Sequence, residues 1–246
     1  MANKIPDRKT PITIQQFLSA LAHAWVNLFE TPANKNQLLV LAAQSALETG
    51  RWHYAHNYNL GNVKSNEGDG RDYTFFACNE ILDPAVAAAY QAKSTPERPA
   101  KVTGQTNGKS EIWFYPEHPG CRFRAYAVLD AAGGVDEEAS LYAGMVDYLG
   151  LLYTRFNSAW PAVLAGDPVA FVKALKARGY FTAPLEPYVN SVQSLFNEFS
   201  KVAFDYDSLP VLSDHQKAQV SNFVTLTLQE SIRDSLAEDL KKRDDS

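Results

Sequence analysis

Hydrophobic residues recur every three or four positions along several stretches of the chain, which is the spacing that places them on one face of an α-helix. The first stretch covers residues 14–29 and follows Thr13 and Gln16, whose spacing matches a capping box. Asn34 and Gln37 repeat this capping pattern before a second stretch. Helical spacing returns further along the chain at residues 141–156, 168–178 and 188–199. The pattern therefore predicts helices before and after a different middle region.

That middle region has the pattern of a small sheet. Residues 51–72 are rich in Asn, Gly, His and Asp, and short aromatic or β-branched runs follow at 73–78, 111–115 and 123–126. We expect a short helix at 84–91 and, because residues 93–109 are polar and contain two prolines and two glycines, an exposed loop there. The order predicts an α+β fold, mainly α, with an antiparallel β lobe at about residues 71–126.

The end of the chain is expected to form a separate unit. Residues 1–203 are predicted to be one domain, and residues 204–246 a linker followed by an amphipathic helix at about 213–243. The apolar stripe of this C-terminal helix either docks on its own domain or is a surface for a partner or a second copy.

Composition excludes several classes of protein. The 246 residues carry a net charge of −5, which gives no overall positive field to hold a nucleic acid. Two cysteines, Cys78 and Cys121, are too few for a disulfide framework or a four-thiolate zinc site. No window reaches the roughly 18 apolar residues of a membrane span. The first residues do not have the pattern of an export signal.

One carboxylate lies on a helix face that is otherwise apolar. Leu41, Ser45 and Glu48 share one face of the second predicted helix, which we expect to end at Gly50. Burial and the negative end of the helix dipole both disfavour the charged form, so they should raise the pKa of Glu48. A raised pKa suits a general acid at neutral pH. The alternative is a Glu48 side chain turned towards water.

Four short motifs, and a tyrosine after them, resemble those of the bacterial glucosaminidase family, which contains peptidoglycan-cleaving enzymes such as flagellar-rod-associated hydrolases, autolysins and phage lysins. The resemblance covers about residues 14–200. The motifs, in chain order, are QSALETG at 44–50, NLGNVK at 59–64, FRAY at 123–126 and GYFT at 179–182, followed by Tyr188.

This resemblance implies a lysozyme-like fold with a glycan cleft between a helical lobe and a β lobe. Glu48 takes the position of the general acid, which protonates the leaving oxygen of a β-1,4 bond between N-acetylglucosamine and N-acetylmuramic acid. Glu80 best matches the second carboxylate, which activates water or stabilises the oxocarbenium ion. Stereochemical retention and inversion both stay open. Other carboxylates in the same region compete with Glu80 for the second role, namely Glu67, Asp69, Asp72, Glu111 and Glu117.

The resemblance also implies roles for aromatic and polar residues. Tyr180 and Tyr188 match family tyrosines whose rings pack on sugar and whose hydroxyls bond near the acid, with core packing as the alternative. Trp52 is a candidate sugar platform, as are Trp113 and Tyr115. Asn59 is expected to hold backbone groups of a loop beneath the cleft, which Gly61 and Lys64 also help to shape. Arg124 is expected to pair with a carboxylate, to contact a substrate carboxylate, or to lie exposed on a strand. The chain departs from the family pattern at Arg51, Trp52, Phe181 and Ala183, and in the longer gap before Tyr188.

Two other chemistries find little support. His53 and His56 have the spacing of two metal ligands, but they lie in an irregular stretch without an evident third ligand, so we expect no metal. Residues 104–110 resemble a phosphate-binding loop but are one residue short and lead into a strand pattern. The expected chemistry therefore needs no cofactor.

Peptidoglycan glycan strands are the expected partner, in the periplasm or at the cell wall. Because the chain begins without an evident export segment, we expect delivery by a phage, a secretion system or an injection apparatus, with residues 83–110 or 213–246 contacting the carrier. Two alternatives stay open: a muramidase or lytic transglycosylase on the same scaffold, and a non-catalytic module for wall binding or assembly.

Overall fold

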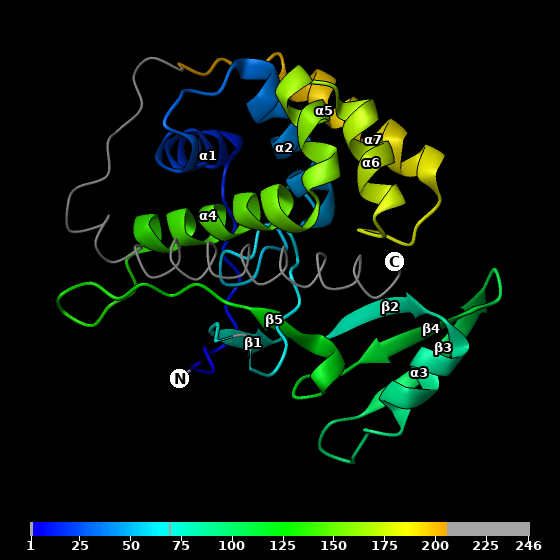
Figure 1. The fold of residues 1–246 in the computed structure, drawn as a ribbon. Helices are drawn as coiled ribbons and strands as arrows, with labels where there is room; N and C mark the ends of the chain where they lie inside the picture. The colour runs from blue at the N-terminus through cyan, green and yellow to red at the C-terminus, as the bar shows by residue number, and fades with distance from the viewer. Residues whose placement is uncertain (1, 69, 206–246) are drawn as a thin grey trace, which may run out of the picture.

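The computed structural model describes residues 2–68 and 70–205, which form an α+β fold that is mainly helical (Figure 1). The helices gather in a helical lobe, and five short strands with one helix form a β lobe beside it. The helical lobe contains α1 (Ile14–Phe29), α2 (Lys35–Glu48), α4 (Glu137–Arg155), α5 (Trp160–Ala165), α6 (Pro168–Ala177) and α7 (Leu185–Phe199). Short 3-10 turns occur at Pro119–Cys121 and Asn157–Ala159.

The predicted capping boxes start the first two helices. Thr13 accepts a hydrogen bond from the backbone N–H of Gln16, whose side chain returns one to the Thr13 backbone, and Asn34 and Gln37 do the same for α2. From Leu38 to Ala46 every residue of α2 is buried. α2 is therefore the central helix of this lobe, and α1, α5, α6 and α7 pack around it.

The β lobe lies at residues 73–124, within the expected bounds, and consists of two small antiparallel sheets. β1 (Tyr73–Phe75) pairs with β5 (Arg122–Arg124), while β2 (Cys78–Leu82), β4 (Lys109–Phe114) and β3 (Ala100–Thr106) form a three-stranded sheet in the order β2-β4-β3. The helix α3 (Pro84–Gln91) occurs where it was predicted and packs on β3 and β4.

The expectation of one exposed loop over residues 93–109 is wrong, because residues 100–106 within it form the strand β3. β3 and β4 form a hairpin whose turn is Asn107 and Gly108, both with positive φ angles of 52° and 76°. Asn-Gly is the favoured pair for such a tight hairpin turn. The strand escapes the sequence pattern because its side chains are mostly exposed and Gly104 follows a bulge in the pairing.

A buried charge cluster joins the two lobes. Asp147, in the middle of α4, is 1% exposed and forms ion pairs with Arg71 at 2.5 Å and with Arg124 of β5 at 2.9 Å. Tyr126 also donates a hydrogen bond to Asp147. α4 lies on the side of the helical lobe that faces the β lobe (Figure 1), so this cluster connects the lobes through the interior.

The N-terminal segment also contacts both lobes. The backbone N–H of Ile5 donates to the carbonyl oxygen of Tyr73 at the edge of β1, and that of Thr10 donates to Ala55 beside the helical lobe. Asp7 is hydrogen-bonded to His56, 2.6 Å away. Residues 3–10 therefore form a second connection between the lobes.

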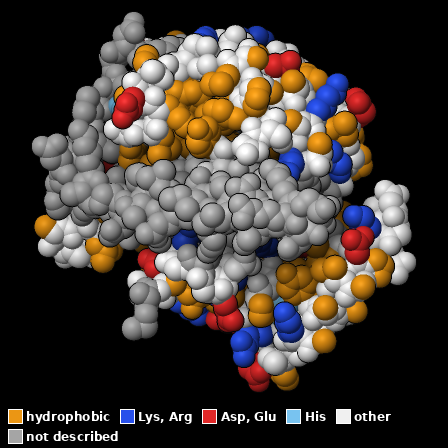
Figure 2. Space-filling view, in the orientation of Figure 1, with side chains coloured by type: hydrophobic (Ala, Val, Ile, Leu, Met, Phe, Trp, Pro, Cys, Tyr) orange, Lys and Arg blue, Asp and Glu red, His pale blue; other side chains and the backbone are white. Residues whose placement is uncertain are grey.

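The predicted C-terminal helix lies outside the described residues, as does nearly all of the linker. Within residues 2–68 and 70–205, no helix combines the length and the apolar character needed to cross a bilayer. On the face seen in Figure 2, hydrophobic side chains gather over the helical lobe, and basic and acidic side chains are interspersed around them.

Candidate functional site

Glu48 is the last residue of α2, and the following loop folds back over this helix end. The side chain of Asn62 donates a hydrogen bond to the backbone oxygen of Glu48 at 2.5 Å, and Ser45 Oγ donates to the carbonyl oxygen of Leu60 at 2.6 Å. The C-terminal carbonyl groups of a helix lack partners within the helix. The Asn62 side chain is the partner of one such carbonyl group, that of Glu48, so the loop at 59–64 fixes the position of Glu48.

The environment of the Glu48 carboxyl raises its pKa above the ordinary value of 4.5, as the sequence predicted. Burial is the largest cause, and the nearby negative charge of Glu80 adds to it. Hydrogen bonds from Tyr188 and Gln44 act in the opposite direction, since they stabilise the ionised form. The net effect favours a protonated carboxyl, which is the state a general acid requires.

A buried polar network holds the Glu48 side chain. Tyr188, from α7, donates to Glu48 Oε1 at 2.5 Å and accepts a hydrogen bond from Gln44 Nε2 at 3.4 Å. Gln44 Oε1 in turn accepts one from the hydroxyl of Tyr148 on α4, at 2.5 Å. Sequence reasoning missed the roles of Gln44 and Tyr148. The position of Gln44, one helical turn before Glu48, is a signal that could have identified it.

Glu80 lies on β2 and forms an ion pair with Lys64, with 2.8 Å between Oε1 and the ammonium nitrogen. Its side chain is 35% exposed, so it reaches solvent. Because its charge contributes to the raised pKa of Glu48, the two carboxylates lie in one electrostatic environment. The structure thus brings together the two residues that the sequence proposed as a pair.

Three of the competing carboxylates have other partners. Asp72 accepts hydrogen bonds from Asn3, Glu111 accepts one from Thr106, and Glu117 pairs with Lys4. None of these three contributes to the pKa shift of Glu48. Asp69 lies outside the described residues.

Tyr180 and Tyr188 contact the residues around the proposed acid through their hydroxyl groups. The ring of Tyr188 is stacked on Phe181 with 3.8 Å between centroids, and the residue is 9% exposed, so a sugar platform at this ring is wrong. Phe181 is one of the departures from the family pattern, and its larger ring covers Tyr188. Tyr180 packs edge-on against Phe156, and its hydroxyl donates to the carbonyl oxygen of Gly61 at 3.4 Å.

The assignment of Trp52 as a sugar platform is also wrong. Trp52 is 2% exposed and lies stacked between Phe17 and Phe199, with centroid distances of 4.7 and 5.7 Å. Its indole N–H donates to Ser45 Oγ at 3.0 Å, which satisfies its polar atom. Trp52 is therefore a core residue beneath α2.

Arg124 and Asn59 have structural roles. Arg124 is 5% exposed and pairs with Asp147, which confirms the expected pairing with a carboxylate. The other two expectations, an exposed position on the strand and contact with a substrate carboxylate, are wrong. Asn59 donates to the carbonyl oxygens of Val63 and Arg124 and accepts from the Val63 N–H, as expected for a residue that shapes the loop.

Trp113 and Tyr115 are each 37% exposed, but the strand register separates them from Glu80. Glu80 lies opposite Ile112 in the pairing of β2 with β4, so these two residues share a face of the sheet. Trp113, the next residue on β4, points to the other face. These aromatic side chains therefore do not line the same surface as Glu80.

The remaining candidates are the possible metal ligand His56 and the two cysteines. His56 pairs with Asp7 and stacks on Phe76, and no group of three or more potential metal ligands occurs among the described residues. Cys78 and Cys121 are free thiols. Burial raises the pKa of the Cys121 thiol to about 12.

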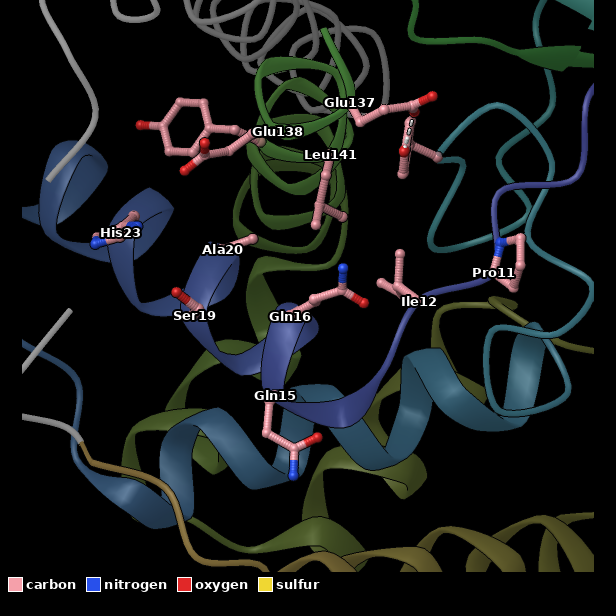
Figure 3. Close-up of a pocket in the computed structure, with 12 residues that line it drawn as sticks. Pro11, Ile12, Gln15, Gln16, Ser19, Ala20, His23, Glu137, Glu138 and Leu141 are labelled. Atoms are coloured by element: carbon pink, nitrogen blue, oxygen red, sulfur yellow. Dashed lines mark hydrogen bonds between the residues drawn. The ribbon is translucent and has the colours of Figure 1, made fainter. Parts of the chain in front are cut away.

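A cavity of about 630 Å³ lies apart from the carboxylate pair, between α1 and the start of α4. Figure 3 shows Gln16, Ser19 and His23 of α1 on one side of it and Glu137 and Leu141 of α4 on the other. Neither Glu48 nor Glu80 lines this cavity. It is a separate feature of the helical lobe.

Comparisons with protein-family models, with curated proteins and with solved structures give no match.

Proposed function

We propose that this protein hydrolyses the glycan strands of bacterial peptidoglycan at the β-1,4 bond between N-acetylglucosamine and N-acetylmuramic acid, with Glu48 as the general acid. The single observation that supports this most is the environment of Glu48, where burial raises the pKa of a carboxyl that is held by Tyr188 and Gln44. The motif resemblance supplies the substrate class.

In the proposed reaction, the Glu48 carboxyl donates its proton to the glycosidic oxygen as the bond to the anomeric carbon breaks. Positive charge develops on the sugar ring, and a nearby carboxylate stabilises such a charge. Glu80 suits this second role because its side chain reaches solvent and its charge acts on Glu48. Water adds to the anomeric carbon, its proton returns to a carboxylate, and the two sugar chains separate.

The same scaffold is compatible with a muramidase or a lytic transglycosylase, and the products distinguish the three. Digestion of purified sacculi followed by mass spectrometry identifies the new chain end. Hydrolysis as proposed leaves N-acetylglucosamine at the reducing end. A reducing N-acetylmuramic acid indicates a muramidase, and a 1,6-anhydro ring indicates a transglycosylase.

The decisive variant is Glu48→Gln, which keeps the size of the side chain but removes its acid proton. We expect release of soluble fragments to fall by about 10²- to 10⁴-fold, the usual contribution of general acid–base catalysis. Glu97→Gln, in an exposed turn of the β lobe, is the matched control and should retain full activity. Equal activity of Glu48→Gln and the parent would refute the assignment.

This proposal places the action of the protein at the cell wall. Carrier contact through residues 213–246 belongs to the same proposal. A chain that ends at residue 205 should still cleave sacculi but should no longer associate with a carrier, and association that persists would exclude this role for the tail.

A further inference from the structure

We infer that Lys64 is a positioning residue for the second carboxylate, and that the segment of residues 59–64 sets the relation between the two acidic groups. This inference rests on the proposed function, because it assigns a role within the same reaction. The contacts of the Lys64 ammonium support this inference. From the sequence, Lys64 was expected only to shape a loop.

The Lys64 ammonium group has a partner for each of its three hydrogens. It lies 2.8 Å from Glu80 Oε1, 2.7 Å from the carbonyl oxygen of Gly120 and 3.3 Å from Cys78 Sγ. It also lies 3.9 Å from the centroid of the Phe123 ring, within the range of a cation–π contact. These contacts come from β2 and from the continuous segment that contains the turn at Pro119–Cys121 and β5, so two segments of the β lobe fix the ammonium position.

This arrangement differs from an ordinary surface ion pair. An exposed pair contributes little, because two long side chains must lose rotamer freedom to meet in water. The Lys64 ammonium, in contrast, is held by a backbone oxygen and an aromatic ring whether or not Glu80 is present. Glu80 therefore meets a cation that is already in place, which favours one orientation of its carboxylate.

The backbone of the same segment holds the proposed acid. Asn62 donates to the backbone oxygen of Glu48, and Asn59 closes the turn through Val63. Lys64, two residues after Asn62, forms an isolated β-bridge with Phe123 of the β lobe. The segment of residues 59–64 thus contacts the proposed acid, Glu48, through Asn62 and the second carboxylate, Glu80, through Lys64. It does so across the boundary between the lobes.

A purely structural role for Lys64 is the competing explanation, and a double-mutant cycle separates the two. Lys64→Met is compared in the parent and in the Glu80→Gln background, with kcat and KM measured on sacculi. If Lys64 acts through Glu80, we expect Lys64→Met to lower kcat about 10- to 100-fold in the parent, with little change in KM, and to have no further effect once Glu80 is neutral.

Three controls complete the experiment. Lys64→Arg keeps the positive charge and should recover most of the lost kcat, which gives a result even where Glu80→Gln retains too little activity to measure. Lys109→Met removes the cation of an exposed ion pair, 3.7 Å from Asp83, that lies outside this cluster, and it should leave kcat unchanged. Thermal unfolding of every variant checks the fold, and Lys64→Gln replaces Lys64→Met if the latter fails to fold.

Two results would overturn the inference. The first is a loss caused by Lys64→Met that is equal in both backgrounds, and the second is a kcat for Lys64→Arg as low as that for Lys64→Met. Failure of the proposed function looks different, because the parent chain itself would then release no glycan fragments from sacculi.

Discussion

Tyr188 donates its hydroxyl hydrogen to Oε1 of Glu48 across 140 residues of sequence, linking the first turn of α7 to the last residue of α2. Gln44 joins them, since it donates to the Tyr188 hydroxyl from one turn earlier on α2. The hydrogen bond from Tyr188 is the main influence that lowers the pKa of Glu48 against the effect of burial. Burial and the Tyr188 hydrogen bond are thus the largest of the opposing contributions that set the pKa of the proposed acid.

Replacement of Tyr188 by Phe should therefore shift the pH dependence of activity. The variant lacks the hydroxyl that stabilises ionised Glu48, so the pKa of Glu48 rises further and the alkaline limb of the kcat profile moves to higher pH. The measurement is kcat on sacculi across a pH series. Tyr153→Phe is the control, because Tyr153 is 47% exposed and does not contribute to the pKa of Glu48. An alkaline limb unchanged in Tyr188→Phe would contradict the prediction.

Glu48→Gln should stabilise the protein at neutral and alkaline pH. The pKa of Glu48 is raised in the folded state above about 4.5, so folding binds an extra proton and loses stability as pH rises through the folded pKa. Gln cannot ionise and avoids this loss, which is about 1.4 kcal/mol for each pKa unit. Melting temperatures of variant and parent should coincide near pH 4 and diverge above it.

The surface variant Glu186→Gln, on the exposed side of α7, serves as the comparison for that experiment. Its melting temperature should follow that of the parent at every pH. A Glu48→Gln variant that is less stable than the parent at pH 8 would mean that the carboxylate is well solvated in the folded protein.

Asp147→Asn should destabilise the protein strongly at any pH where the native carboxyl is ionised. Although burial alone favours its neutral form, the guanidinium groups of Arg124 and Arg71 hold the pKa of Asp147 below its ordinary value. Removing the negative charge beside two buried guanidinium groups should cost about 3–5 kcal/mol, as for other broken buried pairs. Urea denaturation measures this loss.

An exposed ion pair provides the control for Asp147. Glu198 pairs with Arg51 at the surface, at 2.5 Å, and Glu198→Gln should leave the urea midpoint nearly unchanged because solvent screens such pairs. Similar losses in the two variants would argue against a special role for the buried cluster.

Gly144→Ala should destabilise the protein although alanine is the better helix former. A methyl group at residue 144 would lie 2.2 Å from the backbone oxygen of Tyr58, so the loop that carries Tyr58 or the helix α4 would have to move. Overpacking of this kind typically costs about 1–3 kcal/mol, more than the roughly 1 kcal/mol gained from helix propensity. A urea midpoint at or above that of the parent would disprove this close contact.

Local signals predicted much of the fold. Thr13 with Gln16 and Asn34 with Gln37 identified two helix starts, and the helical spacing at 168–178 matches a third helix, α6, which Asp167 caps. Each of these patterns works through contacts between residues two or three positions apart. The direction of the Glu48 pKa shift followed in the same way, because the helical period placed that carboxyl on an apolar face.

Long-range partners account for what sequence reasoning missed. No spacing along the chain shows that Lys64 meets Glu80 or that Tyr148 meets Gln44, because those pairings arise only when the lobes and helices pack. Trp52 was a candidate sugar platform from the family resemblance alone, yet Phe17 and Phe199 cover both of its faces. The strand β3 was obscured because prolines and glycines outweighed the Asn107-Gly108 turn signal.

The link from Asp147 to Arg71 and Arg124 has a consequence for how a polysaccharide would be accommodated. Glu48 belongs to one lobe and Glu80 to the other, so the separation of the two carboxylates depends on how the lobes are held together. Ion pairs between almost fully buried residues hold them at this point. Under the proposed function, a glycan would bind between two carboxylates whose separation this buried cluster helps to maintain. A variant that weakens the cluster should then lose activity through the spacing of the carboxylates and not through recognition of the sugar.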